Sequence, residues 1–205
     1  MSAKMLVKTA DLSRADWLRY RTMGIGGSDV SVIAGINPYR SVYQLWLEKT
    51  GQTEPAERDN EYTHFGTILE PVVRKEFTAR TGLKVRQKHM ILQSEEHPFM
   101  LANLDGVINL DGKMCIFEAK TASAYKLDDW QSDIPPEYML QVQHYMAVTG
   151  AAKTYIAVLK EAALPLNIMT FSAITVYTAV IEKKMIITTT FAHTAVCSVF
   201  PKRRS

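Results

Sequence analysis

Cysteine is scarce in this sequence, with only Cys115 and Cys197 among 205 residues. Neither belongs to a CxxC motif or to a Cys/His cluster with metal-ligand spacing. A disulfide framework and a structural zinc site are therefore not expected, and the composition favours a reducing, cytoplasmic compartment.

A strong charge of one sign is also missing. The 24 basic and 21 acidic residues give a net charge of +3, too small to predict binding to nucleic acid or a membrane surface by itself. The first residues carry charges throughout and lack the apolar segment of a secretory signal. With 47% apolar and 22% charged residues, the composition is typical of a soluble globular protein with no membrane partner.

The composition changes near Lys160. Residues 1–160 hold 19 basic and 19 acidic residues, whereas residues 161–205 hold 5 and 2. The uncharged run from Ala162 to Ile181 contains proline, asparagine and threonine, which makes it a poor membrane span. We predict one folded domain over residues 1–160 and an atypical Thr/Val/Ile-rich tail over 161–205, containing a hairpin that turns near Glu182.

Helical patterns dominate the first part of the chain. Ser13, with Asp16 three residues later, predicts a capped helix over residues 13–21. Ser28 is expected to cap a short second helix, and a third, amphipathic helix follows from Val42 to Lys49. A fourth is expected to begin at Thr67 and end at Gly82.

This fourth predicted helix carries two further expectations. Pro71 would fall in its first turn, where a missing N–H group is tolerated. Val72, Val73 and Phe77 are expected to face the core.

Strand patterns begin after Leu83. Residues 85–94, 100–110 and 113–121 are predicted strands, and Asp111-Gly112 predicts a hairpin turn between the last two. A helix is expected from Pro135 to Gly150, followed by an apolar, central strand over residues 154–159. This order predicts an α/β or α+β sandwich with a mixed sheet.

Three polar side chains in the predicted hairpin could carry chemistry. Glu118 and Lys120 share one face of their strand, and the hairpin can bring Asp105 beside them. Two neighbouring carboxylates repel each other unless a cation lies between them, and hard oxygen ligands suit Mg²⁺. A lysine beside them can orient or deprotonate a water molecule and offset charge on a phosphate. The alternative is a surface hairpin with alternating Glu and Lys, although the apolar neighbours of Glu118 argue against a solvated strand.

Five motifs occur in an order that resembles the YqaJ-type viral recombinase family, whose best-known relative is lambda exonuclease. They are MGIGGSDVSVIAGINPYRSVYQLWLEKTG, HFGTILEPVVRKEF, NLDGVI, FEAKT and YMLQVQHYMAVTG, and the resemblance runs from about Asp16 to Leu159. It implies an α/β fold with a restriction-endonuclease-like core, in which a mixed central β-sheet is flanked by helices. It also implies Mg²⁺-dependent digestion of one strand of duplex DNA from the 5′ end, with Mn²⁺ as a substitute.

The resemblance assigns roles to seven residues. The implied catalytic positions are Asp105, Glu118, Lys120, Gln141 and Glu70. Of these, Asp105, Glu118 and Glu70 are the implied metal ligands. The implied 5′-phosphate-binding residues are Arg21 and Ser28.

Three of these assignments have a structural alternative. Glu70 stands three residues after Thr67, which matches a capping box. Gln141 could be an ordinary surface residue of an amphipathic helix, and Ser28 an ordinary helix cap. Asp29, next to Ser28, would repel an anion, so a phosphate site would depend on Arg21.

The resulting hypothesis is a phage-type deoxyribonuclease of recombination, acting as a 5′→3′ exonuclease on duplex ends in a bacterial or phage-infected cytoplasm. The alternatives are a non-catalytic DNA-end-binding module and an endonuclease on the same core. The expected partners are double-stranded DNA, a single-strand annealing protein and further copies of the chain in a ring. After Leu159 the family's next strand and acidic closing helix are not recognisable, so the tail is interpreted as divergent or frame-shifted.

Overall fold

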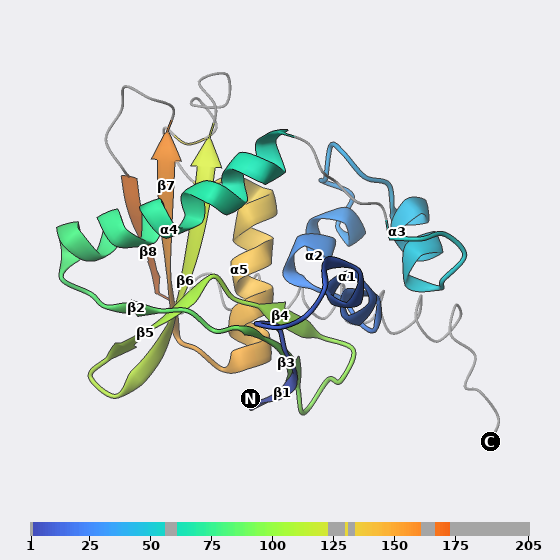
Figure 1. Cartoon of the computed structure of the whole chain (residues 1–205), viewed down its shortest axis with the longest axis horizontal. Helices are drawn as coiled ribbons and strands as arrows, with labels where there is room; N and C mark the ends of the chain where they lie inside the picture. Colours follow the sequence, from blue (N-terminus) through green and yellow to red (C-terminus); the bar gives the residue numbers. More distant parts are fainter. Residues whose placement is uncertain (1, 56–60, 123–129, 131–133, 161–166, 173–205) are drawn as a thin grey trace.

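The computed structural model describes residues 2–55, 61–122, 130, 134–160 and 167–172. The strands form two sheets, and the helices pack around these sheets (Figure 1). None of the helices in these ranges is long and apolar enough to cross a membrane. The predicted hairpin near Glu182 and most of the uncharged run lie outside the described residues.

The N-terminal region contains a strand and three short helices. They are β1 (Ala3–Lys8), α1 (Arg14–Thr22), α2 (Gly27–Ile33) and α3 (Val42–Lys49). The predicted Ser13 cap is confirmed, because its hydroxyl accepts from the Asp16 N–H group at 3.1 Å. The prediction that Ser28 caps α2 is wrong, because the N-cap is Gly26, two residues earlier, and Ser28 lies inside the first turn. The Asp29 carboxylate accepts from the Gly26 N–H group and closes that turn.

Helix α4 (Glu61–Thr81) is longer than the sequence pattern indicated. The predicted start at Thr67 is wrong, since its hydroxyl donates to the Thr63 carbonyl within a helix already under way. Pro71 therefore lies in the helix interior, where it leaves the carbonyl four residues earlier without its usual N–H donor. Val73 and Phe77 are buried as expected, but Val72 is 52% exposed.

The larger sheet has five strands in the order β2-β5-β6-β7-β8. Its strands are β2 (Val85–Arg86), β5 (Gly106–Leu110), β6 (Lys113–Ala122), β7 (Lys153–Lys160) and β8 (Asn167–Ser172). Only the β6–β7 pair is parallel, so the sheet is mixed, as predicted. The hairpin at Asp111-Gly112 is confirmed, and both residues have the positive φ that such a turn requires.

The smaller sheet is antiparallel, with the order β1-β3-β4. Strands β3 (Met90–Ser94) and β4 (Leu101–Asn103) arise where longer single strands were expected. The predicted strands over 85–94 and 100–110 each divide between the two sheets. This division places the β4–β5 turn, which holds Asp105, at the junction of the sheets.

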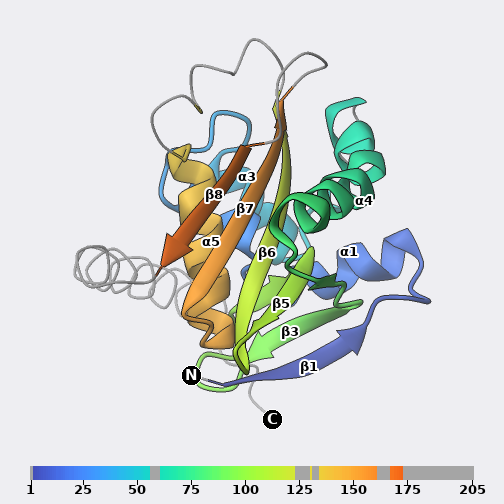
Figure 2. The same cartoon turned by 90° about the vertical axis from the view of Figure 1, so that its left-hand side faces the viewer.

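Helices α4 and α5 (Pro136–Thr149) lie on opposite sides of the larger sheet (Figure 2). On the α4 side, Phe77 and Phe117 are fully buried with ring centroids 4.9 Å apart. Burying one phenylalanine side chain stabilises the folded state by about 1.5–3 kcal/mol. On the α5 side, Val142 packs with Ile156 and Val158 of β7. The α5 boundaries agree with the prediction, including Gly150, which ends the helix with φ 73°.

The larger sheet continues past the predicted boundary at Lys160. Strand β8 pairs antiparallel with β7, from Asn167 opposite Val158 to Ser172 opposite Lys153. The sequence pattern after Leu159 did not reveal the next strand of the family, but residues 167–172 form a strand beside β7. The division into residues 1–160 and 161–205 otherwise stays a prediction.

Candidate active site

Asp105 is placed by the turn between β4 and β5. Its Oδ2 atom accepts from the Ala119 N–H group on β6 at 2.9 Å, which fixes the carboxylate beside that strand. Burial raises the pKa of Asp105 above its ordinary value, partly offset by Lys120 and by this hydrogen bond. The predicted proximity of Asp105 to the Glu118–Lys120 strand is thus present in the fold.

Glu118, Lys120 and Gln141 form a hydrogen-bonded triangle between β6 and α5. Lys120 Nζ donates to Glu118 Oε1 at 2.7 Å and to Gln141 Oε1 at 3.0 Å. Gln141 Nε2 donates to the same Glu118 oxygen at 2.7 Å. Gln141 is therefore no ordinary surface residue, since its amide orients both charged groups of the strand.

The second oxygen of Glu118 is the atom that distinguishes this site. Glu118 is 2% exposed, and its buried Oε2 atom has no hydrogen-bond partner among the residues that the structure describes. Burial and the nearby Asp105 raise the pKa of Glu118 to about 8. A buried carboxylate oxygen without a donor is costly unless a further cation or donor binds there.

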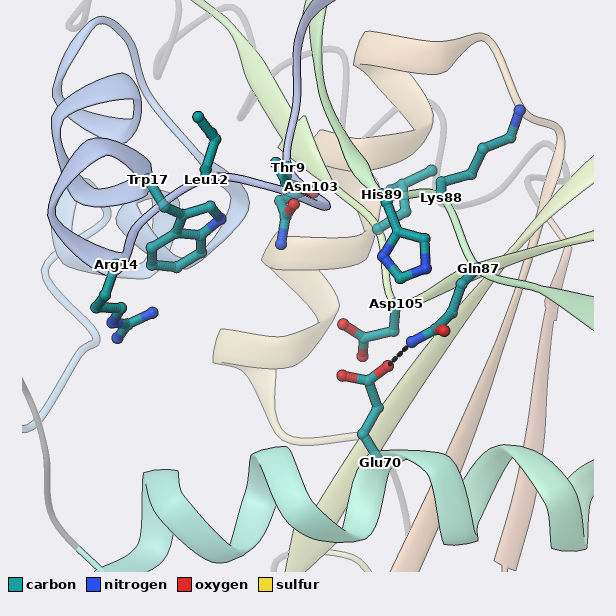
Figure 3. Close-up of a pocket in the computed structure, with 11 residues that line it drawn as sticks. Thr9, Leu12, Arg14, Trp17, Glu70, Gln87, Lys88, His89, Asn103 and Asp105 are labelled. Atoms are coloured by element: carbon teal, nitrogen blue, oxygen red, sulfur yellow. Dashed lines mark hydrogen bonds between the residues drawn. The ribbon is translucent and has the colours of Figure 1, made fainter.

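Glu70 reaches the same region from α4. Figure 3 shows its carboxylate facing that of Asp105, with Gln87 and His89 beside them. Burial and the Asp105 charge raise the pKa of Glu70, while Arg74 and Gln87 act in the opposite direction. Because α4 begins upstream of Thr67, the capping-box explanation of Glu70 is wrong.

Glu70 and Asp105 border an open pocket of about 360 Å³. Its opposite wall is formed by Arg14 and Trp17 of α1 (Figure 3). The pocket thus combines acidic groups on one side with a cation and an aromatic ring on the other.

Arg21 and Ser28 meet at the end of α1 and the start of α2. Arg21 Nη2 donates to Ser28 Oγ at 2.8 Å, and the guanidinium lies 4.7 Å from the centroid of the Trp17 ring. Ser28 is exposed in the first turn of α2. A guanidinium, a hydroxyl and a helix N-terminus together favour a phosphate group.

Asp29 was expected to oppose such an anion, but the fold neutralises it. Arg40 Nη1 lies 3.0 Å from one carboxylate oxygen and Lys49 Nζ 2.7 Å from the other. Burial acts to raise the pKa of Asp29, but Lys49 and Arg21 outweigh it and hold the pKa below its ordinary value. Asp29 is therefore an ionised carboxylate with its charge already balanced.

The Arg21–Ser28 region is packed directly against the Glu118 region. A Cβ atom at Gly27 would lie 2.5 Å from the Tyr145 ring and 2.9 Å from Gln141 Cγ. Tyr145 Oη accepts from Gln141 Nε2 at 3.1 Å. The close approach of α2 to α5 places the two groups of predicted site residues side by side.

The sequence analysis missed several residues of this site. Tyr138 lies under Lys120, whose Nζ atom is 4.8 Å from the ring centroid. Tyr145, Gln87 and His89 also border the charged groups. Tyr145 stands four residues after Gln141, so helical spacing alone could have indicated that it shares the face of Gln141.

The donor set fits a hard divalent cation. Within the described ranges, no three His, Cys, Asp or Glu side chains converge closely enough to define a metal centre. Yet Glu118 Oε2 lacks a partner, and Asp105 and Glu70 approach the same region. Oxygen ligands of this kind suit Mg²⁺ or Mn²⁺.

The fold belongs to a known structural class. The chain is similar to the alkaline exonuclease LHK-Exo from Laribacter hongkongensis, with a TM-score of 0.72 at 18% identity over 90% of this chain and 93% of that one. The structure of LHK-Exo in complex with dAMP gives a TM-score of 0.73 at 20% identity, with the same coverage. A phage-related exonuclease from Haemophilus somnus 129PT gives 0.60 at 14% identity over 86% of this chain and 96% of that one. The predicted α/β, restriction-endonuclease-like core is confirmed.

The sequence identifies the family within that class. The model of the YqaJ-like viral recombinase domain matches residues 16–152, and the chain belongs to this family. It is 47% identical over 160 residues to the uncharacterized protein YqaJ of Bacillus subtilis (strain 168), covering 77% of this chain and 50% of YqaJ. It is 27% identical over 153 residues to the uncharacterized protein R354 of Acanthamoeba polyphaga mimivirus, covering 65% of this chain and 26% of R354. The chain thus spans half the length of YqaJ and about a quarter of R354.

Proposed function

We propose that this protein is a metal-dependent deoxyribonuclease of phage-type recombination that degrades duplex DNA from its ends, 5′ to 3′. The observation that carries the proposal is the partnerless, buried Glu118 Oε2 atom beside Asp105 and Glu70, with Lys120 held at the same place. The similar solved structures are exonucleases, one of them with bound dAMP, and this likeness supports the same class of substrate.

The metal ligands in this proposal are Asp105, Glu118 and Glu70. The bound ion, Mg²⁺ with Mn²⁺ as a substitute, would supply Lewis-acid stabilisation of a phosphodiester and activation of water. The protein contributes a preorganised carboxylate face, because Glu118 is fixed by Gln141 and Asp105 by the Ala119 N–H group.

Lys120 acts in the proposal as a cationic donor. Burial alone would lower its pKa, but Glu118 and Asp105 outweigh that effect and raise it, so the ammonium stays protonated. Two of its N–H groups are directed to Glu118 and Gln141. Among the described residues no acceptor takes the third N–H group, which could orient an attacking water or contact a phosphate oxygen that gains charge.

Arg21 and Ser28 are proposed to bind the 5′-terminal phosphate. Their 2.8 Å hydrogen bond directs the guanidinium toward the exposed start of α2. Since α2 packs on Gln141 and Tyr145, a phosphate held there would place the strand end close to the carboxylates. This arrangement supports cutting at an end rather than at an internal position.

The decisive experiment compares linear with covalently closed duplex plasmid, in Mg²⁺, in Mn²⁺ and in EDTA. We expect loss of the linear DNA in either metal ion and no loss in EDTA, with the closed circle intact. Duplexes labelled at the 5′ or the 3′ terminus then give the polarity. Cleavage of closed circles would favour an endonuclease, and binding of ends without degradation would favour a non-catalytic end-binding module.

The remaining partners follow from the same proposal. A nuclease of recombination leaves single-stranded DNA, which an annealing protein in the same cytoplasm can use. A ring of several copies around the duplex would retain the substrate between cuts. Light scattering of the full chain, alone and with a duplex, tests the assembly.

A further inference from the structure

We propose that Lys49 is a positioning residue that fixes the Arg21–Ser28 anion site and keeps the Asp29 charge away from Arg21. This inference rests on the proposed binding of a 5′-terminal phosphate by Arg21 and Ser28. Lys49 is the last residue of α3, and its side chain is 9% exposed.

The ammonium group of Lys49 joins three parts of the chain. It donates to the Arg21 carbonyl at 2.6 Å and to the Gly24 carbonyl at 2.7 Å. It also lies 2.7 Å from Asp29 Oδ2. An ammonium group has three donors, so this set of acceptors accounts for all of them.

These contacts define the geometry of the predicted phosphate site. The Arg21 and Gly24 carbonyls lie at and just beyond the end of α1, and Asp29 lies in the first turn of α2. Lys49 therefore holds both sides of the segment that turns Arg21 toward Ser28. A cation near the end of α1 also interacts favourably with its helix dipole.

Lys49 also balances the charge of the acidic groups near Arg21. Asp29 and Glu48 are paired with Lys49 and Arg40, so the two acidic and two basic groups balance each other. Arg21 stays outside these ion pairs, although it is close enough to act on the pKa of Asp29. Without Lys49, the Asp29 carboxylate would attract the Arg21 guanidinium in competition with a phosphate.

The test uses a duplex with one open end that carries either a 5′-phosphate or a 5′-hydroxyl group. We expect Lys49→Met to reduce the ratio of the two digestion rates by about tenfold, the scale of one charge-assisted contact. Digestion of the hydroxyl end should change much less. The ratio of end affinities, measured by fluorescence anisotropy in EDTA, should fall in parallel.

Two further variants separate positioning from a loss of folding. Adding Asp29→Asn to Lys49→Met removes the competing carboxylate, so part of the phosphate preference should return. Lys4→Met, on the exposed β1 strand, is the matched control and should keep the wild-type ratio. Melting temperatures of all variants are measured first, and the assays are run well below the lowest of them.

The outcomes are distinguishable. A Lys49→Met protein that keeps the wild-type ratio, or slows on both ends equally, would overturn the inference about Lys49. So would a double variant that recovers none of the preference. A wild-type protein that degrades DNA without any phosphate preference would instead overturn the proposed role of Arg21 and Ser28.

Discussion

Lys120 Nζ lies 2.7 Å from Glu118 Oε1, and the two side chains share one face of β6. The two-residue spacing places them on that face, and Gln141 from α5 then contacts both. This pair leaves the other Glu118 oxygen without a partner.

Replacing Glu118 by Gln should reduce DNA degradation by at least about 100- to 1,000-fold, because one anionic ligand and its electrostatic effect are lost. Duplex binding in EDTA should persist. Asp105→Ala is expected to behave in the same way. Glu76→Gln, which alters an exposed carboxylate paired with Arg80 on α4, is the control and should retain full activity. A Glu118→Gln protein with more than a few per cent of wild-type activity would contradict the assignment.

Replacing Arg21 by Ala should slow digestion of 5′-phosphorylated ends far more than that of 5′-hydroxyl ends. A charge-assisted contact to phosphate is worth about 1.5–3 kcal/mol, which corresponds to roughly 10- to 150-fold. Ser28→Ala should have a smaller effect in the same direction. Equal slowing of both substrates would show that Arg21 has a structural role or contacts the DNA backbone generally.

The stability of the protein in EDTA should fall as the pH rises from about 4.5 to about 8. Burial raises the pKa of Glu118 from its ordinary 4.5 to about 8 in the folded state. Between these two pH values the folded state holds a proton that the unfolded state has released. The contribution of Glu118 to the free energy of unfolding is therefore complete below pH 4.5 and is lost toward pH 8. Melting curves of wild type and Glu118→Gln check this, and the wild type should show the steeper decline. Mg²⁺ should oppose the decline, since it binds the carboxylate form.

Gly27→Ala should destabilise the fold by about 1–3 kcal/mol, the usual cost of overpacking. The added Cβ atom would lie 2.5 Å from the Tyr145 ring, forcing α2 and α5 apart. Gly66→Ala is the matched control within α4, because its nearest neighbour would be Thr121 Oγ1 at 3.8 Å. That change should stabilise the protein by up to about 1 kcal/mol. Denaturant unfolding of both variants measures the difference.

A chain that ends after Lys160 should be less stable than one that ends after Ser172. Only the longer chain retains β8, whose backbone pairs with β7 along the edge of the larger sheet. Removing β8 leaves the N–H and C=O groups of β7 unpaired on that side and open to association with other chains. Melting temperature and light scattering of the two truncated proteins test this. Equal melting temperatures would show that β8 contributes little.

The sequence predicted those features that depend on near neighbours in the chain. The Asp111-Gly112 hairpin, the Ser13 cap and α5 (Pro136–Thr149) with its Gly150 cap follow from local turn and cap chemistry. The two-residue period of side-chain direction in a strand predicted the shared face of Glu118 and Lys120. The family resemblance named the remaining site residues, and the family match confirms that resemblance.

Only the tertiary structure decided how these parts meet. Local pattern could not show that residues 85–94 divide between two sheets, because the pairing partners of β2 and β3 lie elsewhere in the chain. It also misplaced the start of α4, since a threonine hydroxyl can either cap a helix or bond back within one. The partnerless Glu118 oxygen and the neutralised Asp29 arise from contacts between distant elements. Burial and long-range charge set the chemistry of this site, and both exist only once the chain has folded.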